Sequence, residues 1–525
     1  MAAESPPAAP PGGLLSALVF TSGMSVMAVE MTGLRLLAPY FGTSLLVTTV
    51  LIGSMMTFLS VGYWLGGRWG DRHPRLRRLC ATTAVAAVLI LLLPFIAQPI
   101  LRAASAILRP LVEGGELADP AIAVASVAGG LLGTLALMAL PVTLMGTVSP
   151  WAVRLAVYRL DQAGRSAGRL YALSTVGSIV GSFLPALVLI PLLGVRRTFL
   201  SIGTALLLVS SLGLLSRGRT AVVTGAAAAL ALLPTGTVRP MEGLVWEGES
   251  LYHFIQVVQE PYGDCPDAYH LYLNEGIGVH SVRCPDPSKE IRGFWTYMAT
   301  APLWMQQVRP DPQVLMLGLA GGTVAREFLQ AFPEAEVVGV EIDRQVVEVG
   351  KRWLDDDDPR IHPVIMDGRV YLQSTDRHFD VILMDAYRQP HIPFHLVTRE
   401  FFEEVATHLN PGGVVAVNVA SVRGVSRSLA AMIYATMRQV FPQVTWVSAS
   451  QSNDELFATA EPMDPQLVAT RLEQGYRTAA YDRIRRPFRK RIRGEVPGWE
   501  QARVLTDDQA PVELAWDVMT LQYAD

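Results

Sequence analysis

Long apolar blocks in the first 235 residues constrain this chain more than any other feature. They lie near 14–38, 45–67, 79–101, 121–146, 168–193 and 197–215. Each is about 20 residues or longer, which is the length a helix needs to cross about 30 Å of hydrocarbon. A weaker, alanine-rich block follows near 220–234. The sequence therefore predicts a transmembrane domain of six or seven helices over residues 13–235, after a disordered Pro/Ala-rich N-terminus at 1–12.

Arginine placement predicts how this domain is oriented. The second connection, RWGDRHPRLRR, is strongly basic, and the fourth and sixth connections are also rich in arginine. The first connection has no charge, and the third mixes both signs. Basic loops face the cytoplasm, so these connections and the N-terminus are expected there. Six spans would return the chain to the cytoplasm, whereas seven would leave its second half outside. Both counts stay open, and we favour a cytoplasmic second half, since its ligand would be made there. The sequence thus predicts a multi-pass cell-membrane protein.

Bulk composition excludes some partners. The formal charge is −4 and only 17% of residues are charged, so no global feature indicates nucleic-acid binding. Cys80 falls in an apolar block, while Cys265 and Cys284 flank a turn at 274–276 and could meet in a hairpin. Because reducing compartments seldom keep disulfides, we expect two free thiols in a cytosolic domain.

The second half changes to a soluble composition from Thr237. Alternating strands predict a small β-rich module over 236–308, which ends in an aromatic helix from Ile291 to Met305. An α/β Rossmann-like domain, of the class I methyltransferase-like type, is expected over 309–460, and a tail with a helix over 461–525. The tail holds a basic run, Arg483–Arg493, which is either a solvated face or a surface for anionic lipid.

A nucleoside site is predicted at the start of the α/β domain. The segment VLMLGLAGGTVARE is a buried strand, a turn with Gly318 and Gly322, and a helix N-terminus. Such a turn lets a ligand approach the backbone closely. Glu341, Asp367-Gly368 and Asp385 each follow a later strand, with Asp343 just behind Glu341. Open α/β sheets bind ligands at these carboxyl ends, so the acids are expected to share one site.

These motifs resemble the spermidine synthase (polyamine aminopropyltransferase) family in its membrane-fused form. The matching text includes ESLYHFIQVV, LYLNEG, VVGVEID, MDGRVYL, VILMDAY, IPFHLVTREFF and LNPGG. Gly62–Arg72, GYWLGGRWGDR, resembles a loop of major-facilitator transporters. The resemblance implies transfer of an aminopropyl group from decarboxylated S-adenosylmethionine to putrescine or a related amine, with release of methylthioadenosine. The sulfonium is already activated, so no metal is needed. A lipid bilayer and a second copy, as a homodimer, are the other expected partners.

The resemblance also implies residue roles. Asp385 stands where the family has its proton acceptor, and Glu341 where it has its ribose-binding acid. Asp367 and Gly368 match the pair that contacts adenine. Pro393 lies near the family's proline beside the base, and His253 replaces a glutamine that touches the nucleoside.

Three positions depart from the family pattern. Gly321 stands where an aspartate binds the aminopropyl ammonium, Trp295 lies where the family has Tyr-His-Glu, and the loop around Gln389 lacks an acid. An aromatic pocket could bind the cations instead, because aromatic faces attract ammonium groups. Its candidates, which could equally be ordinary packing, are Tyr252, Trp295, Tyr297, Tyr387 and His391.

Two other functions stay open at this stage. Gly321 favours a methyltransferase that uses intact S-adenosylmethionine, since no acid is reserved for an aminopropyl ammonium. The transporter-like first half favours a polyamine transporter or sensor with a non-catalytic synthase-like domain. Glu30, inside the first apolar block, is either paired with Arg35 or another helix, or has a transport role.

Overall fold

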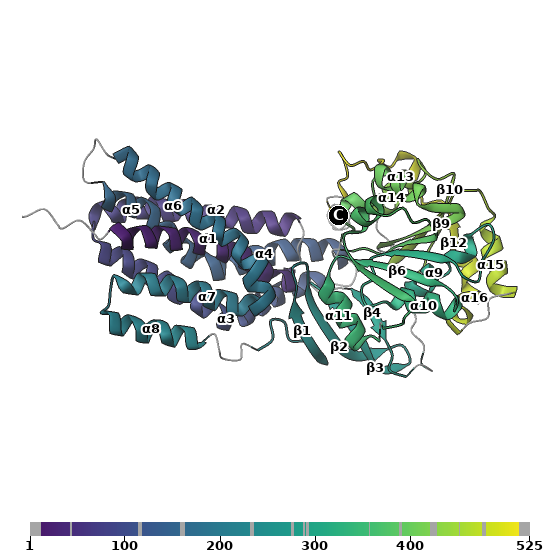
Figure 1. Ribbon diagram of the computed structural model, residues 1–525, viewed down its shortest axis with the longest axis horizontal. Coiled ribbons are helices and arrows are strands. Elements are labelled where there is room, and N and C mark those ends of the chain that lie inside the picture. The colour runs from purple at the N-terminus through teal and green to yellow at the C-terminus, as the bar shows by residue number, and fades with distance from the viewer. Residues whose placement is uncertain are drawn as a thin grey trace, which may run out of the picture. The chain divides into compact units, whose positions relative to one another are not determined.

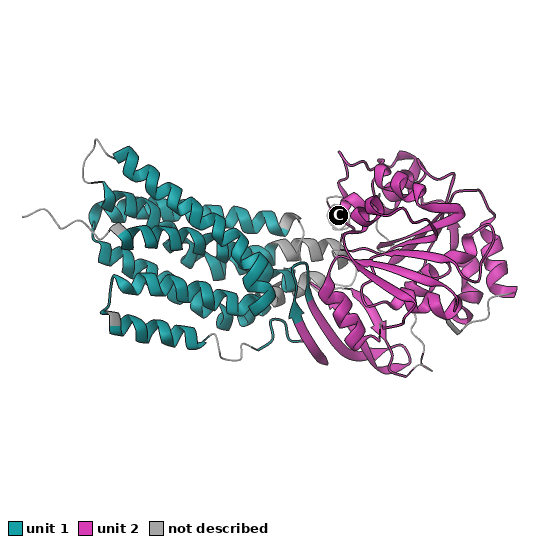
Figure 2. Cartoon of the chain, in the orientation of Figure 1, with its two compact units in different colours: residues 1–113, 125–240, 248–254 teal, residues 114–124, 241–247, 255–525 magenta. Residues whose placement is uncertain are grey.

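The computed structural model describes residues 12–513 except 42–44, 114–117, 158–162, 231–235, 275–277, 287–288, 290–292, 356, 388–390, 421–427, 451 and 475–478. The chain divides into two compact units (Figure 2). Unit 1 comprises Met1–Glu113, Ala125–Pro240 and Gly248–Phe254. Unit 2 comprises Gly114–Val124, Met241–Glu247 and Ile255–Asp525.

Unit 1 is built from helices. They are α1 (Gly12–Phe41), α2 (Leu45–Arg72), α3 (Leu76–Glu113), α4 (Ala118–Gly146), α5 (Val148–Ala156), α6 (Ala163–Leu184), the π-helical turn η2 (Pro185–Leu189), α7 (Ile190–Leu212) and α8 (Arg217–Leu230). Small residues allow close packing of α1 on α6, because a Cβ on Gly177 or Gly181 would collide with the α1 backbone at Phe20 or Met24.

Five helices in the described part of the chain are long and apolar enough to cross a membrane. They are Gly13–Phe41, Val47–Arg72, Leu76–Ala104, Ala128–Ala156 and Ala163–Leu212. The last runs for 50 residues, about 75 Å at 1.5 Å per residue, which is more than twice the hydrocarbon thickness. It is interrupted at Gly194, whose φ of 78° and ψ of 166° are not helical. This stretch therefore supplies two crossing-length segments, in line with six apolar blocks.

A small antiparallel sheet leads into the soluble half. Its order is β1-β2-β3-β4, from β1 (Leu244–Glu249), β2 (Phe254–Tyr262), β3 (Cys265–Leu273) and β4 (Val279–Arg283). The predicted hairpin is confirmed, since β3 pairs with β4. Cys265 and Cys284 form a disulfide, so the expectation of two free thiols is wrong for this structure. Both cysteines lie at the open end of the hairpin, beyond the pair Tyr269–Arg283.

The aromatic helix is shorter than predicted. The helix α9 covers Phe294–Met298, and a 3-10 turn, η3, covers Ala301–Trp304. Pro302 at the start of η3 explains the break, because proline lacks the N–H that a continuing helix needs.

The large sheet has eight strands in the order β12-β10-β11-β9-β8-β5-β6-β7. Five are parallel: β5 (Gln313–Leu317), β6 (Glu336–Glu341), β7 (Ile361–Ile365), β8 (Phe379–Met384) and β9 (Leu409–Ala420). The antiparallel strands are β10 (Gln443–Val447), β11 (Asn453–Thr459) and β12 (Ile492–Gly494). This is the expected Rossmann-like arrangement, and its direction of winding reverses between β5 and β8. Ligands bind at such a switch point.

Helices cover both faces of the large sheet (Figure 1). One face packs on α9, α10 (Thr323–Ala331), α15 (Pro465–Gln474) and α16 (Ala479–Arg491). The other packs on α12 (Gly368–Ser374), the turn η4 (Phe394–Leu396), α13 (Arg399–Thr407), α14 (Ser428–Met437) and the turn η5 (Trp499–Gln501). The small sheet packs on α11 (Arg344–Trp353). Part of the basic run holds α16 in place, since Arg489 pairs with Glu473 of α15.

Candidate active site

Four strand ends converge at the switch point of the large sheet. The Asp385 N–H donates to Leu317 at the end of β5, and the Gly318 N–H donates to Val340 of β6, each at 2.9 Å. Gly318 has φ of 89°, and a Cβ there would lie 2.5 Å from the Asp385 carbonyl oxygen. The predicted glycine turn and the predicted catalytic acid are therefore in direct contact, and only glycine fits between them.

Glu341 organises the glycine turn from the end of β6. Its Oε2 accepts from the Ala320 N–H at 3.0 Å, and its Oε1 accepts from the Asp343 N–H at 3.1 Å. Ala320 has φ of 49°, a conformation that costs free energy for a non-glycine residue. Asp343 caps α11 by accepting from the Gln345 N–H. The carboxylate predicted to hold a ribose thus also stabilises the turn that would face it.

Asp367 sits at the start of α12 with Gly368 behind it. Its Oδ1 accepts from the N–H groups of Arg369 and Val370, and its Oδ2 lies 3.0 Å from His395 Nε2. The hydrogen bond with His395 is the main reason that the pKa of Asp367 is lowered. An ionised acid at a helix N-terminus is held in a fixed orientation, as recognition of an adenine amino group requires.

Asp385 follows β8, and among the described residues its carboxylate accepts a hydrogen bond from Asn418. Its Oδ1 accepts from the Asn418 side-chain amide at 2.8 Å. Burial raises the pKa of Asp385 to about 7, and the hydrogen bond from Asn418 opposes that shift. A base with a pKa near neutrality is well matched to taking a proton at physiological pH. The fold thus raises the pKa of the predicted catalytic acid by partly removing it from water.

A second buried acid lies next to this group and was not predicted from the sequence. Glu455 of β11 is fully buried and is the register partner of Asn418 on β9. Neither of its carboxyl oxygens has a hydrogen-bond partner among the residues that the structure describes. Burial is the main reason that the pKa of Glu455 is raised well above its usual range, and the negative charges of Asp385 and Asp454 add to the shift. An acid inside the apolar pattern of β11 was the sequence signal that could have revealed it.

Two further polar residues escaped the sequence analysis. Ser281 of β4 accepts the Gly321 N–H through its Oγ at 2.9 Å. Arg326 of α10 donates to the Gly321 carbonyl at 2.7 Å and to the Val282 carbonyl at 3.2 Å. The small sheet is therefore hydrogen-bonded to the glycine turn at Gly321, the position at which the family pattern has an aspartate.

The predicted aromatic residues are dispersed. Tyr387 is at the site, but its hydroxyl donates to the Asn418 carbonyl and accepts from the Ala420 N–H. Trp295 and Tyr297 are buried in the core beside α16, where Tyr297 stacks on Phe488. The structure gives these three side chains packing or anchoring contacts.

The remaining predicted positions lie on two loops. His391 is buried, and Pro393 is half-buried at the start of η4. Tyr252 and His253 belong to unit 1, with Tyr252 exposed and His253 buried in a turn closed by Ser250. Gln389 lies outside the described residues.

Known proteins are similar to part of this chain. The spermine/spermidine synthase domain profile matches residues 297–450. A probable polyamine aminopropyl transferase of Bifidobacterium longum is 31% identical over 311 residues, covering 54% of this chain and 67% of that protein. The chain belongs to the polyamine aminopropyltransferase family.

Two further proteins are similar at lower identity. A polyamine aminopropyltransferase of Vibrio vulnificus is 28% identical over 287 residues, covering 52% of this chain and 91% of that protein. Among solved structures, a probable spermidine synthase from Corynebacterium glutamicum superposes with a TM-score of 0.39 at 19% identity, covering 51% of this chain and 97% of that one.

Proposed function

We propose that this protein is a membrane-anchored aminopropyltransferase of the spermidine synthase type. It would transfer the aminopropyl group of decarboxylated S-adenosylmethionine to putrescine or a related amine. The observation that carries this proposal is Asp385, a carboxylate with a pKa of about 7 in contact with the glycine turn of the nucleoside site. Unit 1 would supply the anchor, through its apolar helices.

The reaction is a direct displacement at carbon. The acceptor arrives as an ammonium, so it must first lose a proton, and Asp385 takes it. The freed nitrogen lone pair then attacks the aminopropyl carbon bonded to the sulfonium. A C–N bond forms, the C–S bond breaks, and its electron pair remains on sulfur, which leaves as neutral methylthioadenosine. Most of the acceleration would come from positioning the two reactants, with proton removal adding about 10² to 10⁴-fold.

The nucleoside half of the donor fits the parallel strand ends. Glu341 and Asp343 would bind the ribose hydroxyls, and Asp367 the adenine amino group. Each carboxylate oxygen has two lone pairs, so the backbone contacts of Glu341 leave acceptor capacity for a ligand.

The acceptor half of the site has a different set of acids from the family pattern. In the described part of the loop after Asp385 no second acid occurs, whereas Glu455 lies buried across β9. Asp385 and Glu455 lie in surroundings of low dielectric constant, so their two carboxyls cannot both be ionised without a large free-energy cost. A bound diammonium substrate would offset that cost, so we propose that Glu455 favours the charged amine beside Asp385.

One observation favours a second function, methyl transfer from intact S-adenosylmethionine. At Gly321 there is no acid, and the Arg326 guanidinium donates to its carbonyl oxygen. A cation at this point disfavours an aminopropyl ammonium and favours the carboxylate that only the intact donor carries.

A comparison of donors tests both functions. Purified protein is given putrescine with either donor, and the nucleoside product is identified by chromatography. Methylthioadenosine from the decarboxylated donor is the result expected for aminopropyl transfer. S-adenosylhomocysteine from the intact donor would establish methyl transfer instead. The Arg326→Gln variant should shift preference further toward the decarboxylated donor if the guanidinium selects against it.

A further inference from the structure

Arginines are distributed unequally between the two ends of the helices in unit 1. Arg68–Arg78 holds five of them, Arg154–Arg169 holds four, and Arg217 and Arg219 add two more. These stretches are the connections after α2, after α5 and after α7. The connections after α1, α3 and α6 carry fewer arginines, and Glu113, Glu116 and Asp119 offset them.

The arginine-rich connections meet at one end of unit 1. Arg154 of α5 pairs with Asp71 of α2 at 3.0 Å, and nearby Trp151 packs edge-on against Trp69. Gly213, just after α7, adjoins Cys80 of α3, and Leu14 at the start of α1. The helix α1 therefore begins at this end, and α7 finishes there.

The chain leaves unit 1 at the opposite end. Tyr40, at the end of α1, donates to the Val238 carbonyl at 2.7 Å. Glu249 accepts a hydrogen bond from the Val195 N–H at 3.1 Å. Val195 directly follows Gly194, where the helical backbone is interrupted near the start of α7. Arg35 of α1 donates to the Leu251 carbonyl. Val238, Glu249 and Leu251, which precede β2, are thus hydrogen-bonded to residues near the end of α1 and the start of α7.

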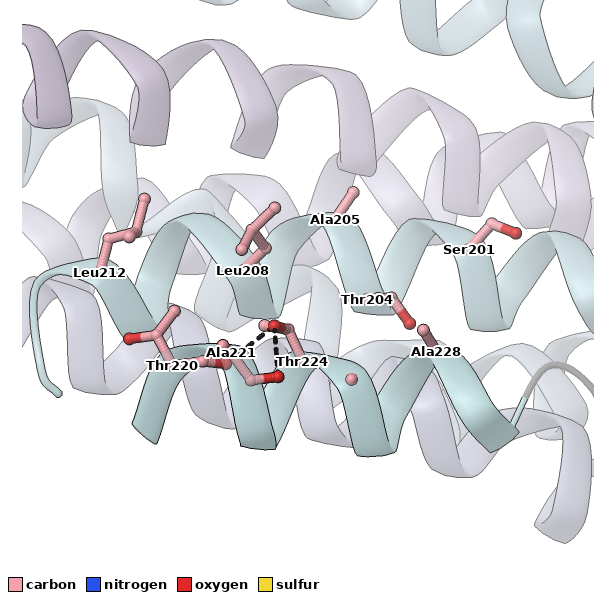
Figure 3. Close-up of a pocket in the computed structure, with 10 residues that line it drawn as sticks. Ser201, Thr204, Ala205, Leu208, Leu212, Thr220, Ala221, Thr224 and Ala228 are labelled. Carbon is pink, nitrogen blue, oxygen red and sulfur yellow. Dashed lines mark hydrogen bonds between the residues drawn. The ribbon is translucent and has the colours of Figure 1, made fainter. Parts of the chain in front are cut away.

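The helix α8, about 21 Å long for its 14 residues, leads part of the way between the two ends. A groove of about 730 Å³ between α7 and α8 shows how the two helices run (Figure 3). Leu212 and Thr220 line one end of it, and Ser201 and Ala228 line the other. Thr220 also donates to the Ser211 carbonyl. Hence α8 runs antiparallel to α7, away from the arginine-rich end, and residues 231–237 join it to Val238.

The disulfide of unit 2 is an independent observation. Cys265 and Cys284 are bonded to each other, and both side chains are buried in the core that carries α9 and α10. Stable disulfides belong to oxidising compartments and are rare in the cytosol.

We infer that the aminopropyltransferase half lies on the non-cytoplasmic side of the membrane. The inference rests on unit 1 spanning the bilayer, as proposed above, and reverses the cytoplasmic location expected from sequence. Basic connections face the cytoplasm, so the opposite end of unit 1 faces outward. The amine and the sulfonium nucleoside must then reach the site from that side. An export step, or supply from the surroundings, must precede the reaction.

Cysteine labelling of the full-length chain tests this in intact cells. The Glu334→Cys variant places a thiol on the exposed turn between α10 and β6, at the strand end away from the site. The matched control, Arg77→Cys, places one at the exposed start of α3, at the arginine-rich end. A membrane-impermeant maleimide is applied before or after permeabilisation.

We expect Glu334→Cys to be labelled equally in both conditions and Arg77→Cys only after permeabilisation. Protection of Glu334→Cys in intact cells would overturn the inference, as would labelling of Arg77→Cys from outside. Labelling does not depend on turnover, so adding Asp385→Asn to either cysteine variant should leave the labelling pattern unchanged. Failure of the proposed reaction would be detected only in the assay of nucleoside products. Acid-trapped wild-type cells should yield one alkylated thiol without reductant and three with it; three without reductant would also overturn the inference.

Discussion

Replacing Asp385 by Asn should slow turnover and stabilise unit 2 at the same time. The amide keeps the shape of the side chain but cannot accept a proton, so we expect turnover to fall about 10² to 10⁴-fold. In the wild type, activity should rise with pH as Asp385 loses its proton, with the midpoint near its pKa of about 7.

The stability effect follows from the direction of the pKa shift. The pKa of Asp385 is about 7 in the folded protein, against an ordinary value of 3.8, so the folded state binds its proton more tightly than the unfolded state. This contribution is complete below about pH 4 and is lost as pH rises to about 7. A shift of about 3 units is worth at most about 4 kcal/mol. Asparagine removes the pH dependence, so its stabilising effect should be about 2 kcal/mol larger at about pH 8.5 than at about pH 5.5.

Two assays check these effects. Chromatography of methylthioadenosine measures turnover, and tryptophan fluorescence on heating measures unfolding at both pH values. Wild-type turnover in Asp385→Asn would refute its role as base. An Asn variant whose unfolding differs from wild type by the same amount at both pH values would refute the raised pKa.

Three further predictions concern the groups around this site. Glu455→Gln should raise KM for the diamine about tenfold with a smaller change in kcat, since a factor of ten in binding needs only about 1.4 kcal/mol. The variant Glu473→Gln, at an exposed position, serves as the control. Equal kinetics in the two variants would contradict the role of Glu455. Gly318→Ala should abolish nucleoside binding in equilibrium dialysis, because its Cβ meets the Asp385 carbonyl, whereas Gly498→Ala, with a similar φ but open space, should bind normally. Replacing both disulfide cysteines by Ser should lower the free energy of unfolding of unit 2 by about 3 kcal/mol, because the bond closes a loop with a sequence separation of 19. Reductant should cause the same loss of stability in the wild type and none in the variant. An unfolding temperature that is the same in wild type and variant would contradict this prediction.

The positions of the residues proposed to bind the nucleoside could be predicted from sequence, because these residues are tied to strand ends. Gly318, Glu341, Asp367 and Asp385 each lie at or just after the carboxyl end of a strand, and parallel pairing brings those ends together. The acceptor half could not be predicted in this way. Glu455 reaches the group only because β11 runs antiparallel beside β9, a long-range pairing that no local pattern encodes.

The membrane half was harder to predict for a different reason. Apolar length identifies spans well, but α8 has only 14 residues, and its direction is set by packing on α7. The disulfide was missed because the expected compartment argued against it, although both cysteines lie at the open end of the predicted hairpin.

Label transfer is the first measurement that we would make on aminopropyl transfer by this protein. Purified protein is incubated with putrescine and decarboxylated S-adenosylmethionine that carries deuterium in its aminopropyl chain, and the products are analysed by mass spectrometry. We expect the deuterium to appear in a lengthened amine, unlabelled methylthioadenosine to be released, and Asp385→Asn to make far less of both. Deuterium that stays entirely with the nucleoside, while intact S-adenosylmethionine yields a methylated product, would contradict aminopropyl transfer.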